Sequence, residues 1–218
     1  GKARKLDLSM AAAVTAAAPA SAQPAAYPSR PVKVIVAFPP GGAIDALARL
    51  VSQRLADAPG QSFVVENRPG AGGVIGTEAA ARAAADGHTL TVGAVSTHGI
   101  NAALYRRLPY DPLKDFAAVV PIAVVPNLLV VNPSLPDKSV QELIAYGARQ
   151  SGPISYATPG AGTSLHLAGE LFATRSGMRL THVPYKGSAP ALNDLIAGHV
   201  PMMFDNLPSA LPLVNAGK

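Results

Sequence analysis

The residues of this sequence best suited to chemistry are polar side chains in glycine-rich loops that follow apolar, β-branched runs. Gly41-Gly42 and then Asp45 follow the run at 32–38, and a loop rich in Gly, Ser and Thr at 159–164 follows the run at 154–158. The first turn of a helix carries unpaired backbone N–H groups and about half a positive charge, and glycine lets a ligand approach the backbone closely. Such loops are candidate anion sites, and two of them across a cleft would bind a small carboxylate or dicarboxylate.

Covalent and metal chemistry have little support in the sequence. There is no Cys, which excludes disulfides, thiolate zinc sites and a Cys nucleophile. No Ser lies in a GxSxG motif, and no two His residues have the HExxH spacing. His98 and His166 each lie at a strand-to-helix loop, where they either cap and pack or face a ligand. We therefore expect no metal, no cofactor and no enzymatic activity.

Nucleotide and nucleic-acid binding also fit poorly. Gly70, Gly72 and Gly76 form GxGxxxG and not the dinucleotide fingerprint GxGxxG, and no GxxxxGK[ST] motif occurs. The net charge is +5, but the 18 basic residues are spread along the chain and Trp is absent. A nucleic-acid-binding protein would show a basic stripe with stacking aromatic residues. The sequence therefore favours a small-molecule partner.

Strands that alternate with helices are expected to position these loops. Several β-branched or apolar runs lead through a glycine- or serine-containing loop into a segment with helical spacing. The predicted strands are 32–38, 62–65, 89–95, 154–158, 181–185 and 201–204. This alternation predicts an α/β fold with largely parallel sheets, in which ligands bind beyond the carboxyl ends of the strands.

The middle of the chain, 117–133, differs from the rest because it has no helix of its own. Pro121, Pro126 and Pro133 interrupt it, and proline breaks a helix, so a membrane-spanning helix is excluded despite the low charge. The short runs Val119-Val120 and Val124-Val125, together with Leu128 to Val131, predict buried strands. We interpret this stretch as a crossover between two α/β lobes.

The N-terminus is typical of an export signal. Lys2, Arg4 and Lys5 precede a low-charge stretch at 8–18, and Ala20-Ser21-Ala22 is a small-x-small cleavage pattern. A flexible Ala/Pro tail is the alternative. The predicted organisation is a signal peptide-like segment at 1–22, a linker at 23–30, a first lobe at 31–122, and a crossover with a second lobe at 123–218.

A series of short strings runs through almost the whole chain after the N-terminal segment. They are FPPGGAID at 38–45, VENRPGAGG at 65–73, LPYDP at 108–112, LVVNP at 129–133, GTSLHLAGEL at 162–171, HVPYKG at 182–187 and MFDN at 203–206. Together and in this order they resemble the Bug family of periplasmic solute receptors, which serve tripartite tricarboxylate transporters.

The resemblance implies an exported, periplasmic receptor with the type II periplasmic binding protein (Venus flytrap) fold, whose two lobes close on a small carboxylate. It implies that backbone amides, hydroxyls and bridging waters of both lobes hold the ligand. The implied ligand-binding residues are Phe38, Gly41, Gly42, Ala43, Asp45, Thr97 and His98 in the first lobe, and Thr158, Gly160, Gly162, Thr163, Ser164, His166, Tyr185 and Asp205 in the second.

The same resemblance implies partners and a longer chain. Membrane transporter subunits are the expected partners, with signalling through a membrane sensor protein as the alternative, and the full-length form is expected to be a monomer. A periplasmic enzyme is a weaker alternative, because no general base and nucleophile can be assembled from these residues. Family members continue past the equivalent of Lys218, so the resemblance implies a missing C-terminal part that completes the first lobe, and weak binding or none by this chain.

Overall fold

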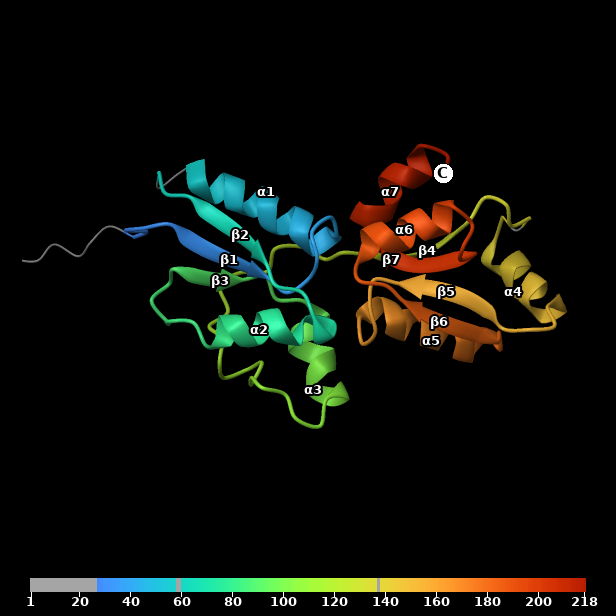
Figure 1. Ribbon diagram of the computed structural model, residues 1–218, viewed down its shortest axis with the longest axis horizontal. Helices are drawn as coiled ribbons and strands as arrows, with labels where there is room; N and C mark the ends of the chain where they lie inside the picture. The colour runs from blue at the N-terminus through green and yellow to red at the C-terminus, as the bar shows by residue number, and fades with distance from the viewer. Residues whose placement is uncertain (1–26, 58–59, 137) are drawn as a thin grey trace, which may run out of the picture.

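The computed structural model describes residues 27–57, 60–136 and 138–218. The predicted signal segment at 1–22 and the start of the predicted linker lie outside these residues. Within them, the chain forms two α/β bodies, each built on its own sheet, with an extended segment between them (Figure 1). No helix in these ranges is long and apolar enough to cross a membrane.

The first lobe is a parallel sheet between helices. Its described strands lie in the order β2-β1-β3, so β1 is central. Helix α1 covers one face of the sheet and α2 the other (Figure 1). The bounds are β1 Val32–Val36, α1 Ala43–Asp57, β2 Phe63–Asn67, α2 Val74–Ala81 and β3 Thr89–Thr91. Because β1 is buried among these elements, the position at which the following loop, 38–42, begins is fixed by packing.

The packing of α2 against the end of β1 depends on a glycine. A Cβ atom built on Gly76 would lie 2.6 Å from the carbonyl oxygen of Arg68 and 2.7 Å from the Cα atom of Ala37. Real Cβ atoms do not approach backbone atoms this closely, so only glycine fits. Beyond β3, a π-helical turn at Ser96–Ile100 leads into α3 (Asn101–Leu104), which completes this side of the lobe.

The second lobe is a mixed sheet with helices on both faces. The described strands have the order β4-β7-β5-β6, and β4 is antiparallel to β7 while the other pairs are parallel. The bounds are β4 Asn127–Val131, α4 Val140–Arg149, β5 Ile154–Thr158, α5 Ser164–Ser176, β6 Leu180–Pro184, α6 Ser188–Ile196, β7 Met202–Asn206 and α7 Leu207–Asn215. Helices α4 and α5 cover one face, and α6 and α7 cover the other (Figure 1).

Alternation along β7 supplies both cores of the second lobe. Met202 and Phe204 belong to the core beneath α4 and α5, whereas Met203 belongs to the core beneath α6 and α7. This follows from the period of two along a strand, which sends successive side chains to opposite faces. Asp205, next in the strand, is also fully buried. The carboxyl end of β7 is therefore a polar position inside an apolar lobe.

The segment between the lobes differs from the prediction. Residues 117–126 contain no strand, and Val119 and Val124 are 80% and 97% exposed. The prediction of buried strands at Val119-Val120 and Val124-Val125 is therefore wrong. The predicted strand at Leu128 to Val131 is part of β4, which pairs with β7. None of the described strands pairs with this stretch. Largely parallel sheets were predicted, and among the described strands only β4 departs from this, because it runs antiparallel to β7.

Candidate functional site

The loop at 38–42 in the first lobe is held by a buried carboxylate. Asp45, in the first turn of α1, is only 4% exposed. Its Oδ2 accepts a hydrogen bond from the Gly41 N–H at 3.0 Å, and its Oδ1 accepts one from Asn67 Nδ2 at 2.8 Å. Arg49, one turn further along, donates to both oxygens at 3.1 and 2.9 Å. Asn67 also donates to the Phe38 carbonyl at 3.0 Å. The Asp45 carboxylate therefore holds Gly41 directly and Phe38 through Asn67.

The same contacts keep Asp45 charged. Burial alone would raise the pKa of this carboxyl, but the hydrogen bonds from Arg49, Asn67 and Gly41 bring the pKa below its usual value. The negative charge lies at the N-terminus of α1, where the helix dipole stabilises it. Since both oxygens are already engaged, the carboxylate orders the loop, and the unpaired first-turn amides beside it stay available.

The loop at 159–163 in the second lobe is ordered by a helix cap. Thr163 is the N-cap of α5, because its Oγ1 accepts a hydrogen bond from the His166 N–H at 3.3 Å. The same hydroxyl donates to the Gly160 carbonyl at 2.8 Å. The amides of Ser164 and Leu165, in the first turn, have no intrahelical partner because of their position. They form the same kind of anion site as the start of α1.

Two other amides of this loop are used internally. The Gly160 N–H donates to Thr158 Oγ1 at 3.3 Å, and the Gly162 N–H donates to His166 Nδ1 at 3.3 Å. Gly160 and Gly162 were expected from the sequence to offer amides to a ligand. In the structure these amides shape the loop, and the first turn of α5 supplies the free ones.

The loops of the two lobes lie in contact. A Cβ atom built on Gly42 would lie 3.9 Å from Ser188 Oγ at the start of α6. A Cβ atom built on Gly72 would lie 3.4 Å from the carbonyl oxygen of Ala161. The absence of side chains at Gly42 and Gly72 therefore leaves space at the lobe junction, which is the place where the loops of the two lobes meet and where the start of α1 approaches the second lobe (Figure 1).

Asp205 and Tyr185 are held within the second lobe. Asp205 Oδ1 accepts a hydrogen bond from Ser188 Oγ at 2.7 Å, and its Oδ2 has no hydrogen-bond partner among the described residues. Burial raises the pKa of Asp205, against the hydrogen bonds from Ser188 and Asn206, which lower it. The Tyr185 hydroxyl donates to Asp194 on α6 at 2.7 Å. Ser188 thus connects Asp205 to the lobe junction, whereas the Tyr185 hydroxyl is committed to α6.

Thr97 and His98 anchor the π-helical turn of the first lobe. Thr97 Oγ1 accepts a hydrogen bond from the Ala94 N–H at 3.0 Å and lies 2.8 Å from His98 Nδ1. The His98 ring packs edge-on against Phe116, with centroids 4.9 Å apart, and burial lowers the pKa of His98. The His98 ring therefore packs within the lobe, which is one of the two roles that the sequence left open for it, and the Thr97 hydroxyl is used within the same turn. No group of three or more His, Asp or Glu residues in the described ranges is arranged to hold a metal ion.

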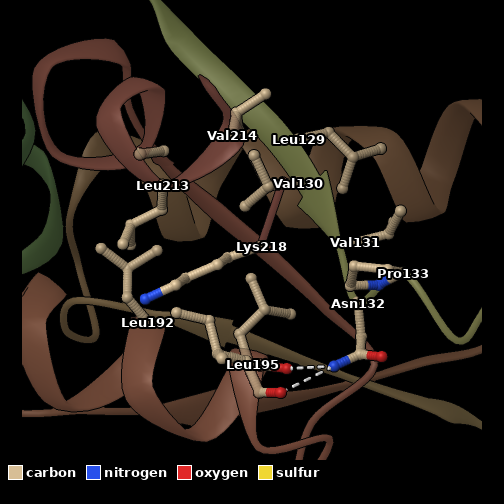
Figure 2. Close-up of a pocket in the computed structure, with 12 residues that line it drawn as sticks. Leu129, Val130, Val131, Asn132, Pro133, Leu192, Leu195, Leu213, Val214 and Lys218 are labelled. Carbon is tan, nitrogen blue, oxygen red and sulfur yellow. Dashed lines mark hydrogen bonds between the residues drawn. The ribbon is translucent and has the colours of Figure 1, made fainter. Parts of the chain in front are cut away.

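A cavity of about 260 Å³ in the second lobe is not at these loops. It lies between β4, α6 and α7, and Figure 2 shows aliphatic side chains such as Leu192 and Val214 around it. The Asn132 amide in its wall is already used, because it donates to the carbonyls of Leu195 and Ile196 at 2.6 and 3.2 Å. A site for carboxylates needs several converging polar groups. We therefore place the candidate site at the loops of α1 and α5.

A comparison with known protein families shows to which family this chain belongs. Residues 47–218 match the model of the tripartite tricarboxylate transporter family receptor. The chain belongs to this receptor family. It is a family of periplasmic binding proteins and not of enzymes. The fold class, the periplasmic location and the family resemblance predicted from the sequence are therefore confirmed.

Individual receptors of this family are similar over most of the chain. BugT of Bordetella pertussis is 43% identical over 202 residues, which are 92% of this chain and 61% of BugT. The solved structure of R. palustris Rpa4515 with adipate is 46% identical, has a TM-score of 0.85, and is matched over 88% of this chain and 64% of that one. MatC (Rpa3494) from Rhodopseudomonas palustris with bound malate is 36% identical, has a TM-score of 0.80, and is matched over 88% and 65%. The chain spans 61% of the length of the first curated relatives it matches.

Three residues that hold the two loops were not among the site residues predicted from the sequence. They are Arg49, Asn67 and His182. Arg49 follows Asp45 by one helical turn, and this i,i+4 spacing of opposite charges is a signal that could have found it. Asn67 and His182 reach the loops only because β2 pairs with β1 and β6 with β5. No local pattern indicates contacts that depend on strand pairing.

The pKa of His182 predicts that stability depends on pH. Burial, with His166 beside it, lowers the pKa of His182 from 6.5 to about 4, while Glu170 acts in the opposite direction. Between these values the unfolded chain binds a proton that the folded chain does not, so the free energy of unfolding should fall as the pH drops from 6.5 towards 4. Urea unfolding at several pH values measures this slope. The slope should be smaller in His182→Gln, and an equal slope in that variant would contradict the assignment.

Proposed function

We propose that this chain forms the ligand-binding part of a receptor that captures a small carboxylate or dicarboxylate between two lobes. Uptake would then follow through the membrane subunits of a tripartite tricarboxylate transporter, which we propose as its partners. The observation that carries the proposal is the pair of helix N-termini, those of α1 and α5, each preceded by a polar loop fixed in shape. The adipate of Rpa4515 and the malate of MatC support a dicarboxylate as the ligand class.

The chemistry of the two loops favours neutral donors over side-chain cations. Arg49 is engaged by Asp45 and Asn67, and Lys186 is exposed on the loop before α6. A carboxylate would therefore be bound by backbone N–H groups at the start of each helix, by hydroxyls, and by bridging waters. Water-mediated hydrogen bonds are nearly as favourable in enthalpy as direct ones. A ligand with two carboxylates could satisfy the anion sites of both lobes at once.

The test is a binding screen on the purified chain of 218 residues. The resemblance implies weak binding or none by this chain, but both helix N-termini of the proposed site are present in it. We therefore expect adipate, malate and succinate to raise the melting temperature in a saturable manner, because a ligand that binds only the folded state stabilises it. Isothermal titration calorimetry would then give the affinity of each acid. The matched control is 1,4-diaminobutane, which has similar length and opposite charge and should have no effect. The proposal fails if none of the acids stabilises the protein, or if the diamine does so equally.

Replacing Gly42 with valine should weaken binding without unfolding the protein. The new side chain would project toward Ser188 across the lobe junction, and it adds no backbone strain because Gly42, unlike Gly41 (φ +86°), does not have a positive φ. Blocking the amides at the start of α1 should cost about 1–3 kcal/mol, or roughly a tenfold to hundredfold loss of affinity. Calorimetry with the acid that binds best measures the loss. Gly152→Val, at a site with open space, is the control, and equal affinity in Gly42→Val would place the ligand elsewhere.

A further inference from the structure

Three rings of the second lobe form a column from the sheet to α5. Tyr156 on β5 pairs in register with His182 on β6, and their rings stack with centroids 5.0 Å apart and planes 29° apart. His182 stacks in turn on His166 of α5, with centroids 4.0 Å apart and planes 19° apart. The Tyr156 hydroxyl donates to Glu170 Oε1 at 2.6 Å. The column therefore fixes the position of His182 between the sheet and the helix.

His182 contacts the ligand loop through Thr158. Its Nε2 lies 2.6 Å from Thr158 Oγ1, and this oxygen accepts the hydrogen bond of the Gly160 N–H. Thr158 Oγ1 is also within donating distance of the Gly160 carbonyl, but at a longer 3.2 Å, and that carbonyl accepts another hydrogen bond from Thr163. The Thr158 proton is therefore best placed on the side of His182, with Nε2 as the acceptor. In this arrangement His182 orients the Thr158 hydroxyl, and the oxygen of that hydroxyl fixes the position of the Gly160 amide by accepting its hydrogen bond.

His166 holds the other half of the loop directly. Its Nδ1 accepts the Gly162 N–H at 3.3 Å, so its ring proton lies on Nε2, which is 3.7 Å from Glu170 Oε1. Each imidazole thus uses one unprotonated nitrogen to fix the loop. The titratable groups that face His182 are Tyr156 from β5 and both His166 and Glu170 from α5. The stacked His166 ring is one of the groups that lower the pKa of His182.

We propose that His182 is a positioning residue for the ligand-binding loop at 159–163, acting through the Thr158 hydroxyl. Its contact with Thr158 needs no ligand, so it acts before the ligand arrives and fixes the Gly160 amide within the loop that leads to the free amides of α5. The effect on affinity rests on the proposed function, whereas the effect on the loop does not. Two measurements separate these parts.

The first measurement is hydrogen exchange of the Gly160 and Gly162 amides by NMR in the ligand-free protein. His182→Leu should speed exchange at the Gly160 amide by about tenfold, since a lost hydrogen bond of about 1.4 kcal/mol corresponds to that factor. The Gly162 amide donates to His166 instead, so its exchange should change less. In His182→Gln the side-chain carbonyl can accept from Thr158, so exchange should stay close to wild type. His199→Gln is the matched control, because His199 is 70% exposed in the same lobe and contacts Asp194 instead of the loop. Wild-type exchange in His182→Leu, or an equal increase throughout the second lobe, would overturn the proposal.

The second measurement is a double-mutant cycle on affinity for adipate and malate. If His182 acts through Thr158, then His182→Leu and Thr158→Val should each weaken binding about tenfold, and the double variant should be no weaker than Thr158→Val alone. Losses that multiply would show that the two residues act independently, which would contradict the proposal. If the wild-type chain binds neither acid, the proposed function fails, and hydrogen exchange still decides whether His182 positions the loop.

Discussion

Replacing Gly76 with valine is expected to lower the free energy of unfolding by about 3 kcal/mol. The added Cβ would be forced against the Arg68 carbonyl oxygen and the Ala37 Cα atom, at 2.6 and 2.7 Å. Both are backbone atoms of segments that adjoin the central sheet, so neither can rotate aside as a side chain would. Helix α2 must then move away from the end of β1, which also displaces the start of the ligand loop at 38–42. Urea unfolding followed by circular dichroism measures the loss.

The control for Gly76 is a helical glycine with ordinary space around it. Gly99 has only the Val95 Cγ2 atom nearby, 3.7 Å from a built Cβ, and it does not have a positive φ. Gly99→Ala should therefore change stability by a small amount. Gly76→Ala should be intermediate, because it adds the Cβ clash without the two methyl groups of valine. Equal stabilities of Gly76→Val and wild type would mean that α2 does not pack as described.

Replacing Asp45 with alanine is expected to cost about 2–3 kcal/mol of stability, and to weaken carboxylate binding. The substitution removes the acceptor for Arg49, Asn67 and the Gly41 N–H together, and hydrogen bonds to a charged group are the stronger kind. The loop at 38–42 would lose the group that ties its ends, so a ligand would have to order it on binding. Urea unfolding and calorimetry with adipate measure the two effects.

The pH dependence of the Asp45 effect provides its internal check. Because hydrogen bonding brings the pKa of Asp45 below the ordinary 3.8, its contribution is complete above that pH and is lost as the pH falls through the lowered value. The difference between wild type and Asp45→Ala should therefore shrink in strong acid. Glu78→Ala is the matched control, since Glu78 pairs only with the exposed Arg82 on α2. Such a surface pair contributes about 0–1 kcal/mol. Equal losses in both variants would contradict a special role for Asp45.

The strands and helices around the second loop were predictable because local signals agree there. The apolar run at 154–158 is flanked by Gly152-Pro153 and Pro159-Gly160, and strand β5 likewise begins at Ile154 and ends at Thr158. Helix α5 then extends over Ser164–Ser176, in agreement with the segment of helical spacing that the sequence predicts after this loop. Turn residues on both sides of a short apolar run leave little freedom for its ends.

Other elements were not predictable in the same way. Val119-Val120 and Val124-Val125 have the composition of buried strands, but composition does not reveal whether a neighbouring strand exists, and none of the described strands pairs with them. Helix α4 was not predicted, although Ser139 caps it by accepting from the Glu142 N–H at 3.2 Å. The sequence signal for this cap, Ser followed three residues later by Glu, was present.

Part of the candidate site was likewise predictable from the sequence, and part was not. The glycine loops and Asp45 were indicated by their position between a strand and a helix, and the structure places both loops at helix N-termini near the lobe junction. The partners that fix the loops were not indicated, because Asn67 and His182 come from neighbouring strands. Sequence position shows where a loop begins, whereas its shape depends on contacts between segments far apart in the chain.

The exposed stretch at 117–126 has a consequence for how this chain behaves at high concentration. Segments that assemble into cross-β aggregates are about six or seven residues long, rich in β-branched residues, and free of proline. Val119, Val120 and Val124 fit the first part of this description and are exposed. Pro121 and Pro126, however, divide the stretch into pieces shorter than such a segment and remove two backbone donors. The prolines therefore hinder this exposed, valine-rich segment from pairing as a β-strand with the same segment of another molecule.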